Sequence, residues 1–260
     1  MERRPWGARP TITWARTAVG AALVLASLCL AGCTSVPDPR SAPAEEASSH
    51  DARPQAITTP APQVSQAPFD LSTHPTDRAN SPWVVVNRER ALRPVDYEPE
   101  LVLVEGYQVD PRAAESLRVL LRDVRRAGLD LRLMSAYRSY GRQASLFAAR
   151  VSELGRAGAM RVVAPPGHSE HQTGLAVDFG RSSTGECNVM PCFAETAESR
   201  WLRRHAWRYG FVLRYPEGGE RMTGYSEESW HYRYVGRSLA SYLEHEDIAT
   251  LEEAFDLRSS

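Results

Sequence analysis

The sequence predicts an α+β fold: a single domain in which helices flank a small, mostly antiparallel sheet. Two observations lead to this class. The length of 260 residues, with 42% hydrophobic and 24% charged residues, is that of an ordinary globular protein that buries one core. Helical and strand patterns then follow one another along the chain without the regular strand-helix-strand rhythm of a parallel sheet.

The N-terminus has the layout of an export signal. Arg3 and Arg4 precede an uncharged run over residues 17–31, and Cys33 follows a Leu-Ala-Gly tripeptide. So short an apolar run falls below the roughly 20 residues that a membrane helix needs. The pattern resembles a bacterial lipobox, so we expect residues 1–32 to be a lipoprotein signal peptide and Cys33 to be the acylated N-terminus. A plain signal peptide or an uncleaved anchor is the alternative.

Three regions are expected after the signal. Residues 33–80 are rich in Pro, Ala, Ser and Thr and poor in large apolar side chains. They cannot bury enough surface to offset the entropy of ordering the chain, so they are predicted to be a disordered tether. Residues 81–247 are predicted to form the folded domain, and residues 248–260 a C-terminal tail.

The domain is predicted to open with a strand over residues 83–86, a tryptophan followed by three valines. A helix should then begin after Asp110, a capping residue that precedes a proline at the first helical position. Large apolar residues recur at offsets of zero, three, four and seven from Leu117, and Gly128 is expected to end this helix.

The remaining elements follow from alternation and capping. A strand is expected over residues 131–136, and Ser139 should cap a second helix with Phe147, Val151 and Leu154 on one face. Further along, we expect a strand over 175–179, a helix over 196–209 that ends at Gly210, and strands over 211–215 and 230–235. In the last strand, His231 and Arg233 should face opposite to the neighbouring aromatic residues.

The four cysteines divide by position. Cys29 lies within the signal and Cys33 at its end, which leaves Cys187 and Cys192. In an oxidising compartment such a pair is expected to form a disulfide rather than a metal site, with two free thiols as the alternative.

Position also removes most of the seven histidines as metal ligands. Two lie in the tether, one inside a predicted helix and one near the tail: His50, His74, His205 and His245. The candidates that remain are His168, His171 and His231.

Two of these histidines and one acid fit a zinc site. A catalytic zinc takes three protein ligands and keeps a fourth position for water. His171 and Asp178 could meet at one ion if the chain turns at Gly174, and His231 would be the third ligand, from the late strand. Taken alone, each residue is more simply a polar surface group or a hydrogen-bonded core residue.

Glu228 precedes His231 by three residues, which is close enough to reach a water on the same metal. A carboxylate in that position can act as general base and later return the proton. Glu227 and Glu170 are the competing acids, and a solvated loop acid is the alternative. Arg138 follows the strand that ends at Ala136, where its planar fork could bind a carboxylate or an oxyanion; a surface role is the alternative.

Three segments, 135–139 with Gln143, 169–178 and 228–236, resemble the signature blocks of VanY-type D,D-carboxypeptidases. That family shares its zinc-peptidase fold with VanX dipeptidases and Hedgehog domains. The resemblance extends over roughly residues 83–240. One departure is Ser229, where the family commonly has proline.

The resemblance implies roles for these residues. His171, Asp178 and His231 would be the Zn2+ ligands and Glu228 the base, while Arg138, Ser169 and Gln143 would hold the substrate. Trp230 would wall the metal site, and the loop between the two late cysteines is expected to rim the cleft.

The implied activity is removal of the C-terminal D-Ala from peptidoglycan stem pentapeptides. A D,D-dipeptidase, a cell-wall endopeptidase and a catalytically silent peptidoglycan-binding module are the alternatives. A serine D,D-peptidase with a Ser-x-x-Lys motif is excluded because all 31 basic residues are arginine. We expect an exported monomeric lipoprotein that faces the cell wall, and no basic patch indicates a nucleic-acid partner.

Overall fold

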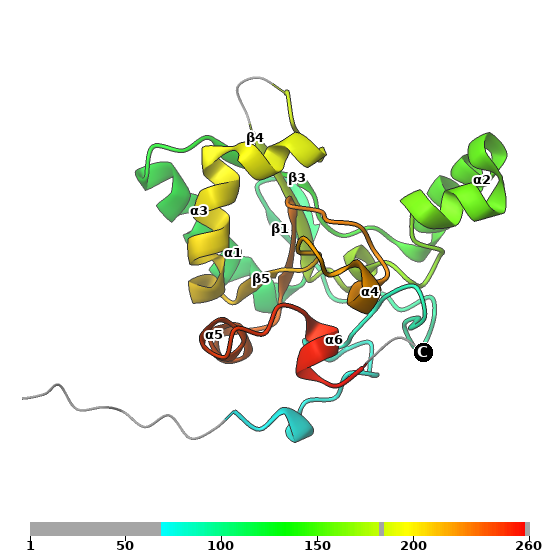
Figure 1. The fold of residues 1–260 in the computed structure, drawn as a ribbon, viewed down its shortest axis with the longest axis horizontal. Helices are drawn as coiled ribbons and strands as arrows, with labels where there is room; N and C mark the ends of the chain where they lie inside the picture. Colours follow the sequence, from blue (N-terminus) through cyan, green and yellow to red (C-terminus); the bar gives the residue numbers. More distant parts are fainter. Residues whose placement is uncertain (1–68, 182–184, 258–260) are drawn as a thin grey trace, which may run out of the picture. The chain divides into compact units, whose positions relative to one another are not determined.

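The computed structural model describes residues 69–181 and 185–257, which belong to one compact unit, Pro62–Ser260. Its helices and antiparallel strands confirm the α+β class (Figure 1). The predicted signal peptide, Cys33 and the tether up to residue 68 lie outside the described residues. Within the described part of the chain, every helix is too short or too polar to cross a bilayer.

An antiparallel sheet of four strands positions the site. Its strand order is β3 (Leu131–Ser135), β4 (Ala176–Arg181), β6 (His231–Tyr234) and β5 (Phe211–Leu213). The register of β4 and β6 places Asp178 directly opposite His231. Opposite residues of an antiparallel pair project to the same face, so these two side chains meet. A separate hairpin joins β1 (Val102–Val104) and β2 (Tyr107–Val109).

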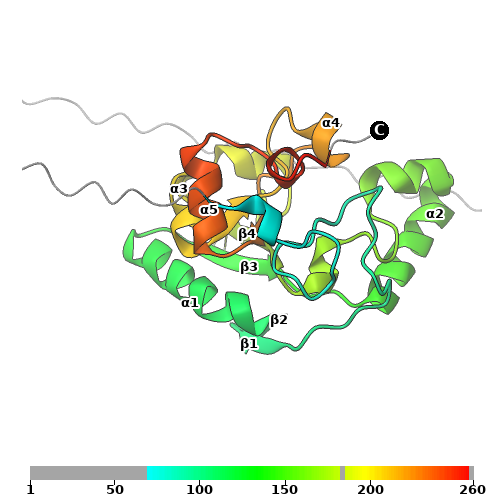
Figure 2. The same ribbon diagram turned by 90° about the horizontal axis from the view of Figure 1, so that it is seen from below.

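Helix α1 (Pro111–Arg126) forms as its sequence predicts. The Asp110 carboxylate accepts a hydrogen bond from the Arg112 backbone N–H at 2.9 Å, and Gly128 adopts a left-handed φ of 75° after the last turn. The buried face holds the four residues of the predicted pattern, Leu117, Leu120, Leu121 and Val124. Figure 2 shows α1 running along the hairpin and β3, and its buried face packs with the sheet in one core cluster.

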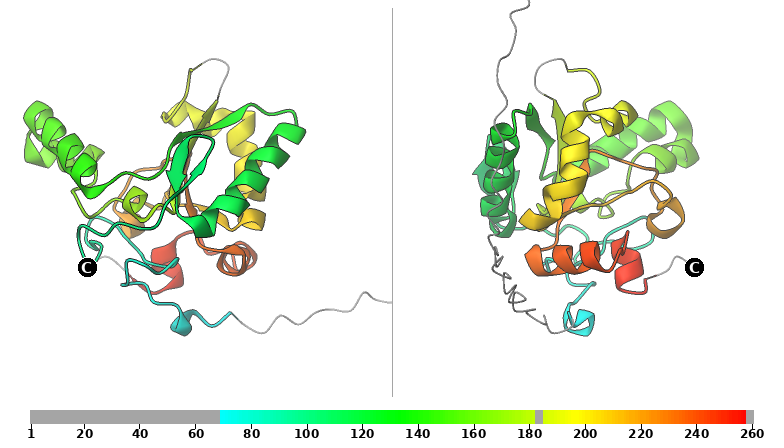
Figure 3. Two further views of the ribbon diagram at one scale, coloured as in Figure 1. Left: turned by 180° about the vertical axis from the view of Figure 1, so that it is seen from behind. Right: turned by 60° about the vertical axis from the view of Figure 1, so that its left-hand side comes forward.

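Helix α2 (Tyr140–Val162) begins at the predicted cap, where Ser139 Oγ accepts from the Arg142 backbone N–H at 3.3 Å. Its predicted apolar face is only partly confirmed. Phe147 is buried, but Leu154 is 52% exposed, and the helix is interrupted at Gly155. The later turns of α2 stand away from the sheet (Figure 3), so they have no sheet surface to cover.

The second half of the unit follows the predicted order with changes in detail. The helix expected over 196–209 is an α-helix, α3 (Ala197–His205), followed by a 3-10 turn, η4 (Ala206–Tyr209), which ends at Gly210. Three further short helices occur in this half of the chain: η3 (Pro191–Glu195) precedes α3, and α4 (Glu220–Thr223) and α5 (Arg237–His245) follow η4.

The prediction of a strand over residues 83–86 is wrong. This segment is buried but pairs with no other described strand. Its carbonyl groups accept hydrogen bonds from side chains instead, because Arg233 Nη2 donates to Val84 O at 3.0 Å and Arg214 Nη2 reaches Val86 O at 3.5 Å. The apolar side chains of this segment are therefore buried in the core, but its backbone does not form part of a sheet.

The packed unit extends beyond the predicted domain limits on both sides. Residues from 69 onward include η1 (Leu71–Thr73) and the buried Ala79, although residues up to 80 were assigned to the tether. Residues assigned to the tail form α6 (Leu251–Ala254), which buries Leu251 and Glu252. Both segments contribute to a cluster with α5, and they are too short to show a periodic pattern in the sequence.

Candidate metal centre and active-site cleft

His171, Asp178 and His231 converge as predicted. One possible ligand atom from each lies within 4.8 Å of the others, and all three side chains are buried. His171 Nε2 is 3.2 Å from Asp178 Oδ2, and His231 Nδ1 is 2.9 Å from Asp178 Oδ1. Two imidazoles and one carboxylate facing one another are a donor set that suits zinc.

Local geometry brings His171 back over the sheet. The residue lies in a 3-10 turn, η2 (Glu170–Thr173), which ends at Gly174 with a φ of 70°. The Gly174 backbone N–H donates to His171 O at 3.2 Å, which closes the turn directly before β4. A left-handed residue here favours glycine, as the sequence indicated.

Hydrogen bonds fix which nitrogen of each histidine faces Asp178. His171 Nδ1 is 2.7 Å from Ala136 O, so it donates a proton to that carbonyl and leaves Nε2 as the lone-pair nitrogen. His231 is turned the other way, because its Nε2 lies 3.4 Å from Glu170 Oε2 and its Nδ1 faces Asp178. Each imidazole therefore presents a ligand atom to the same point.

The charges at the site favour a cation. Burial alone would raise the pKa of Asp178, but its attraction to His171 and its close contacts with both imidazoles lower that pKa well below its usual range. Burial lowers the pKa of His171. Burial would also lower the pKa of His231, but hydrogen bonds to Asp178 and Glu170 raise it to about 9, so a metal ion at Nδ1 replaces a proton.

Glu228 lies beside the metal centre. Its Oε2 is 3.8 Å from His231 Nδ1, and its side chain is 34% exposed, so it is accessible from the cleft. The turn is held by the His231 backbone N–H, which donates to Glu228 O at 3.0 Å. Burial raises the pKa of the Glu228 carboxyl above its ordinary value, which suits a group that takes up a proton.

The two competing acids, Glu170 and Glu227, are placed differently around the same cleft. Glu170 is fully buried and contacts the Nε2 side of His231, while Glu227 lines the cleft and, among the described residues, makes no hydrogen bond or ion pair with a ligand histidine. Glu228 is therefore the acid placed to exchange a proton at the metal centre.

Arg138 lies in the same cleft, beyond the end of β3. Its backbone N–H donates to His171 O at 3.1 Å, which ties it to the metal-binding turn, and its Nη2 donates to Ser169 Oγ at 3.4 Å. Burial lowers the pKa of the guanidinium, and its Nε has no hydrogen-bond partner among the described residues. Donors are thus available for an anionic ligand.

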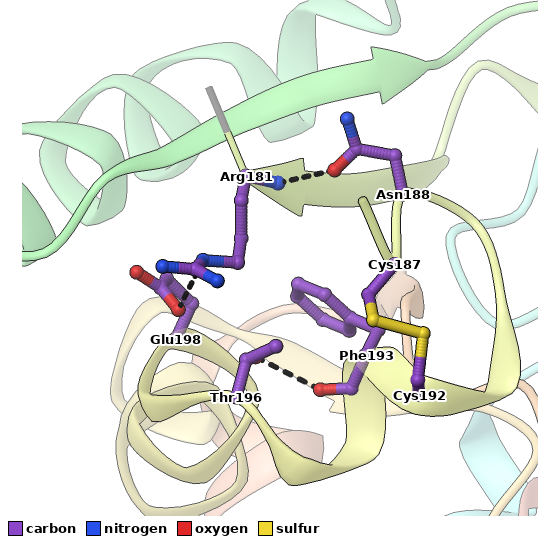
Figure 4. Close-up of a disulfide and its surroundings, with 7 residues drawn as sticks. All are labelled: Arg181, Cys187, Asn188, Cys192, Phe193, Thr196 and Glu198. Carbon is purple, nitrogen blue, oxygen red and sulfur yellow. Dashed lines mark hydrogen bonds and ion pairs between the residues drawn. A yellow bond between two sulfur atoms is a disulfide. The ribbon is translucent and has the colours of Figure 1, made fainter. Parts of the chain in front are cut away.

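The cleft has a volume of about 590 Å3 and contains the metal centre, Glu228, Arg138 and Ser169. Trp230 lines it, as predicted. Cys187 and Cys192 form the predicted disulfide (Figure 4), and Val189 and Pro191 from this loop also line the cleft, which confirms the expected rim. Asn188 holds the loop to the sheet, since its Oδ1 accepts from the Arg181 backbone N–H at 2.6 Å.

Gln143 does not lie in the cleft. It is fully buried, and its amide donates to Ala164 O at 2.6 Å. This bond joins α2 to the loop after it, and the amide oxygen of Gln143 has no hydrogen-bond partner among the described residues, so its contact with substrate stays a prediction. A short motif shows which residues are close in sequence but not which side of a helix they occupy.

Comparison with known proteins identifies the family. A model of the D-alanyl-D-alanine carboxypeptidase VanY matches residues 106–237, a span that includes the metal centre, Glu228 and Arg138. The chain belongs to the VanY family. The putative carboxypeptidase YodJ of Bacillus subtilis (strain 168) is 39% identical over 183 residues, which cover 66% of this chain and 66% of YodJ.

Two solved structures of similar proteins share the fold of this VanY-family chain. The first is the LdcB LD-carboxypeptidase, whose structure reveals the molecular basis of its peptidoglycan recognition. It is 36% identical to this chain with a TM-score of 0.64, and the match covers 70% of this chain and 88% of LdcB. A mutant of the vancomycin-resistance D,D-pentapeptidase VanY in complex with Zn(II) is 34% identical with a TM-score of 0.57, covering 65% and 96%.

Proposed function

We propose that this VanY-family protein is a zinc-dependent D,D-carboxypeptidase that removes the C-terminal D-Ala from peptidoglycan stem pentapeptides. The observation that carries the proposal is the arrangement of the cleft. It holds the ligand atoms of His171, Asp178 and His231, the Glu228 carboxylate and the Arg138 guanidinium together. The Zn(II) complex of the similar D,D-pentapeptidase supports the choice of metal and substrate.

Each residue has a role that follows from its position. Zinc held by the three ligands would polarise the scissile carbonyl and lower the pKa of a water molecule. Glu228 accepts a proton from the attacking water and delivers it to the departing amine of D-Ala. Arg138 binds the terminal carboxylate of the peptide, and Ser169 orients the guanidinium through its hydroxyl.

A second candidate is an L,D-carboxypeptidase, which removes D-Ala from a tetrapeptide. The observation that favours it is the similarity to LdcB, whose TM-score of 0.64 is above the 0.57 of the D,D-pentapeptidase. Both reactions release a C-terminal D-Ala, so the same zinc ligands, base and arginine serve either one. They differ in the residue that precedes the scissile bond.

The test is hydrolysis of four substrates by the purified zinc-loaded protein: a muramyl pentapeptide, the corresponding tetrapeptide and free D-Ala-D-Ala, followed by release of D-Ala, and a cross-linked stem dimer, followed by release of separate stem peptides. We expect the pentapeptide to be cleaved with the highest kcat/KM and a chelator to stop the reaction. Preference for the tetrapeptide would establish the second candidate. Exclusive cleavage of the dipeptide or of the cross-link would assign a dipeptidase or an endopeptidase, and no turnover with zinc bound would indicate a silent binding module.

We also propose that the protein is exported and anchored to the membrane by a lipid on Cys33, so that its tether lets the domain reach the cell wall. The N-terminal pattern supports this proposal. Mass spectrometry of the mature N-terminus should find an acylated Cys33, and a Cys33→Ser variant should leave the membrane fraction. A mature chain that begins elsewhere would contradict it. The monomeric state stays a prediction.

A further inference from the structure

Four charged side chains are buried next to His231 and have no role in the mechanism above: Glu170, Arg214, Arg233 and Glu252, each no more than 1% exposed. Glu170 Oε1 accepts from Arg214 Nε and from Arg233 Nη1, both at 2.8 Å. Glu252 binds the other edge of Arg214 with both oxygens, at 2.6 and 2.8 Å. Two acids and two arginines balance in charge, so the network has no net charge.

The network is attached to both ends of the packed unit. Arg233 Nη2 donates to Pro82 O at 3.1 Å and to Val84 O at 3.0 Å, in the segment that forms no strand. Asn87 Nδ2 donates to Glu252 Oε1 at 2.9 Å. Glu252 itself comes from α6, so the N-terminal segment and the last helix are joined behind the metal centre.

The second oxygen of Glu170 points to the metal ligand, because its Oε2 lies 3.4 Å from His231 Nε2. With Oε1 held by two guanidinium groups, the Glu170 carboxylate cannot turn away without breaking two charge-assisted hydrogen bonds. A proton held on Nε2 leaves Nδ1 with the lone pair, and a fixed ring directs that lone pair to the point that Asp178 and His171 also face.

Stability alone gives little reason for such an arrangement. Four buried charges carry a large desolvation cost, and apolar residues of the same volume often stabilise a fold as well or better. We propose that Glu170 is a positioning residue for His231, and that Arg214, Arg233 and Glu252 hold it in place. Zinc affinity therefore depends on α6, which lies outside the segment that the family model matches. This inference rests on the proposed zinc site.

The test is the zinc dissociation constant of full-length variants, measured by competition with a chromogenic chelator. Glu170→Gln, which keeps the shape and removes the charge, should weaken zinc binding by about 10- to 100-fold. Glu252→Gln should weaken it less, because Glu252 acts on His231 only through Arg214 and Glu170. Zinc affinity equal to that of the wild type in both variants would overturn the proposal.

The matched control is Glu198→Gln. Glu198 is also a buried acid, 4% exposed, and its partner Arg181 lies 3.3 Å away at the end of β4. This variant should lower the melting temperature but leave the zinc dissociation constant within about twofold of the wild type. If Glu198→Gln weakens zinc binding as much as Glu170→Gln does, the loss of a buried ion pair anywhere in the fold is enough to weaken zinc binding. The positioning role of Glu170 is then refuted.

A measurement on the wild-type protein does not depend on variants that fold. Nitrogen-15 spectra of the zinc-loaded chain should show the His231 ring proton on Nε2 and the His171 ring proton on Nδ1. A His231 proton on Nδ1 would refute the role of Glu170 while zinc binding itself stands. Failure of the wild-type protein to bind zinc would overturn the proposed function as well.

Discussion

Glu228 and Glu170 show how the surroundings of a side chain decide its role. Both are glutamates within 4 Å of a nitrogen of His231. Burial raises the pKa of Glu228 by more than the charges of His231 and Arg138 lower it, whereas Arg214 and Arg233 overcome the effect of burial at Glu170 and lower its pKa. Burial therefore favours the protonated form of Glu228, whereas the two arginines favour the ionised form of Glu170.

We expect Glu228→Gln to lower kcat for D-Ala release by about 10²- to 10⁴-fold, because the amide cannot accept the proton of the attacking water. Steady-state assays with the pentapeptide measure the loss, and zinc content should remain that of the wild type. The control is Glu227→Gln, which changes the neighbouring acid in the same cleft and should keep most of the activity. Equal losses in the two variants would contradict the assignment of Glu228.

At the scale of single elements, the turn that joins η2 to β4 leaves little space for a side chain at position 174. Gly174 has a φ of 70°, and a Cβ atom there would lie 2.9 Å from the Asp110 backbone nitrogen. That nitrogen also donates to Gly174 O at 2.9 Å, so the turn and the start of α1 are in direct contact. The turn that carries His171 is therefore held by backbone contacts on both sides.

We expect Gly174→Ala to destabilise the protein by about 2 kcal/mol or more, because it adds a steric contact with the backbone to the cost of a left-handed alanine. Urea unfolding measures the change. The control is Gly106→Ala, since Gly106 has a φ of 86° with nothing within 4 Å of the added Cβ. It should lose only about 1 kcal/mol, and equal losses would show that the contact at Asp110 is not limiting.

Elements whose signals are local could be predicted from the sequence. Asp110 with the following proline and Gly128 mark both ends of α1 because capping acts within one helical turn. The sequence does not show that residues 83–86 form no strand, because the groups that bind their carbonyls are distant: Arg233 lies 149 positions after Val84, and Arg214 lies 128 positions after Val86. Burial and strand pairing give the same apolar run in a sequence.

The same distinction applies to the site. The ligands and Glu228 could be predicted because metal chemistry restricts residue types and because their spacing matches a known family. For Glu170 the sequence indicates only a competing base, since its arginine partners come from β6 and the residue after β5. The role of Glu252 had no signal in the sequence, because a single acid in a short terminal segment is ordinary.

At the scale of the whole molecule, the metal centre lies between segments that are distant in sequence. His171 and Asp178 come from the middle of the chain, His231 comes from the last strand, and the buried network continues from there to α6. A bound ion therefore stabilises the packing of the folded state as a whole and not one element.

We expect removal of zinc by a chelator to lower the melting temperature by about 10 °C, since a ligand at about 1,000 times its dissociation constant contributes about 4 kcal/mol. Differential scanning calorimetry with and without the chelator measures the shift. A His171→Ala variant should show little or no shift, because one ligand is missing. If the wild-type protein melts at the same temperature with and without the chelator, zinc does not stabilise the folded state and the prediction is wrong.

The register of β4 and β6 has a consequence for how the protein acquires its metal. Asp178 and His231 are 53 positions apart in the chain and come together only when the two strands pair. Closing so long a loop costs entropy that one weak ligand contact in an unfolded chain cannot repay. The complete set of three ligands therefore exists only in the folded chain, so we expect a metal ion to bind the folded state far more tightly than the unfolded one.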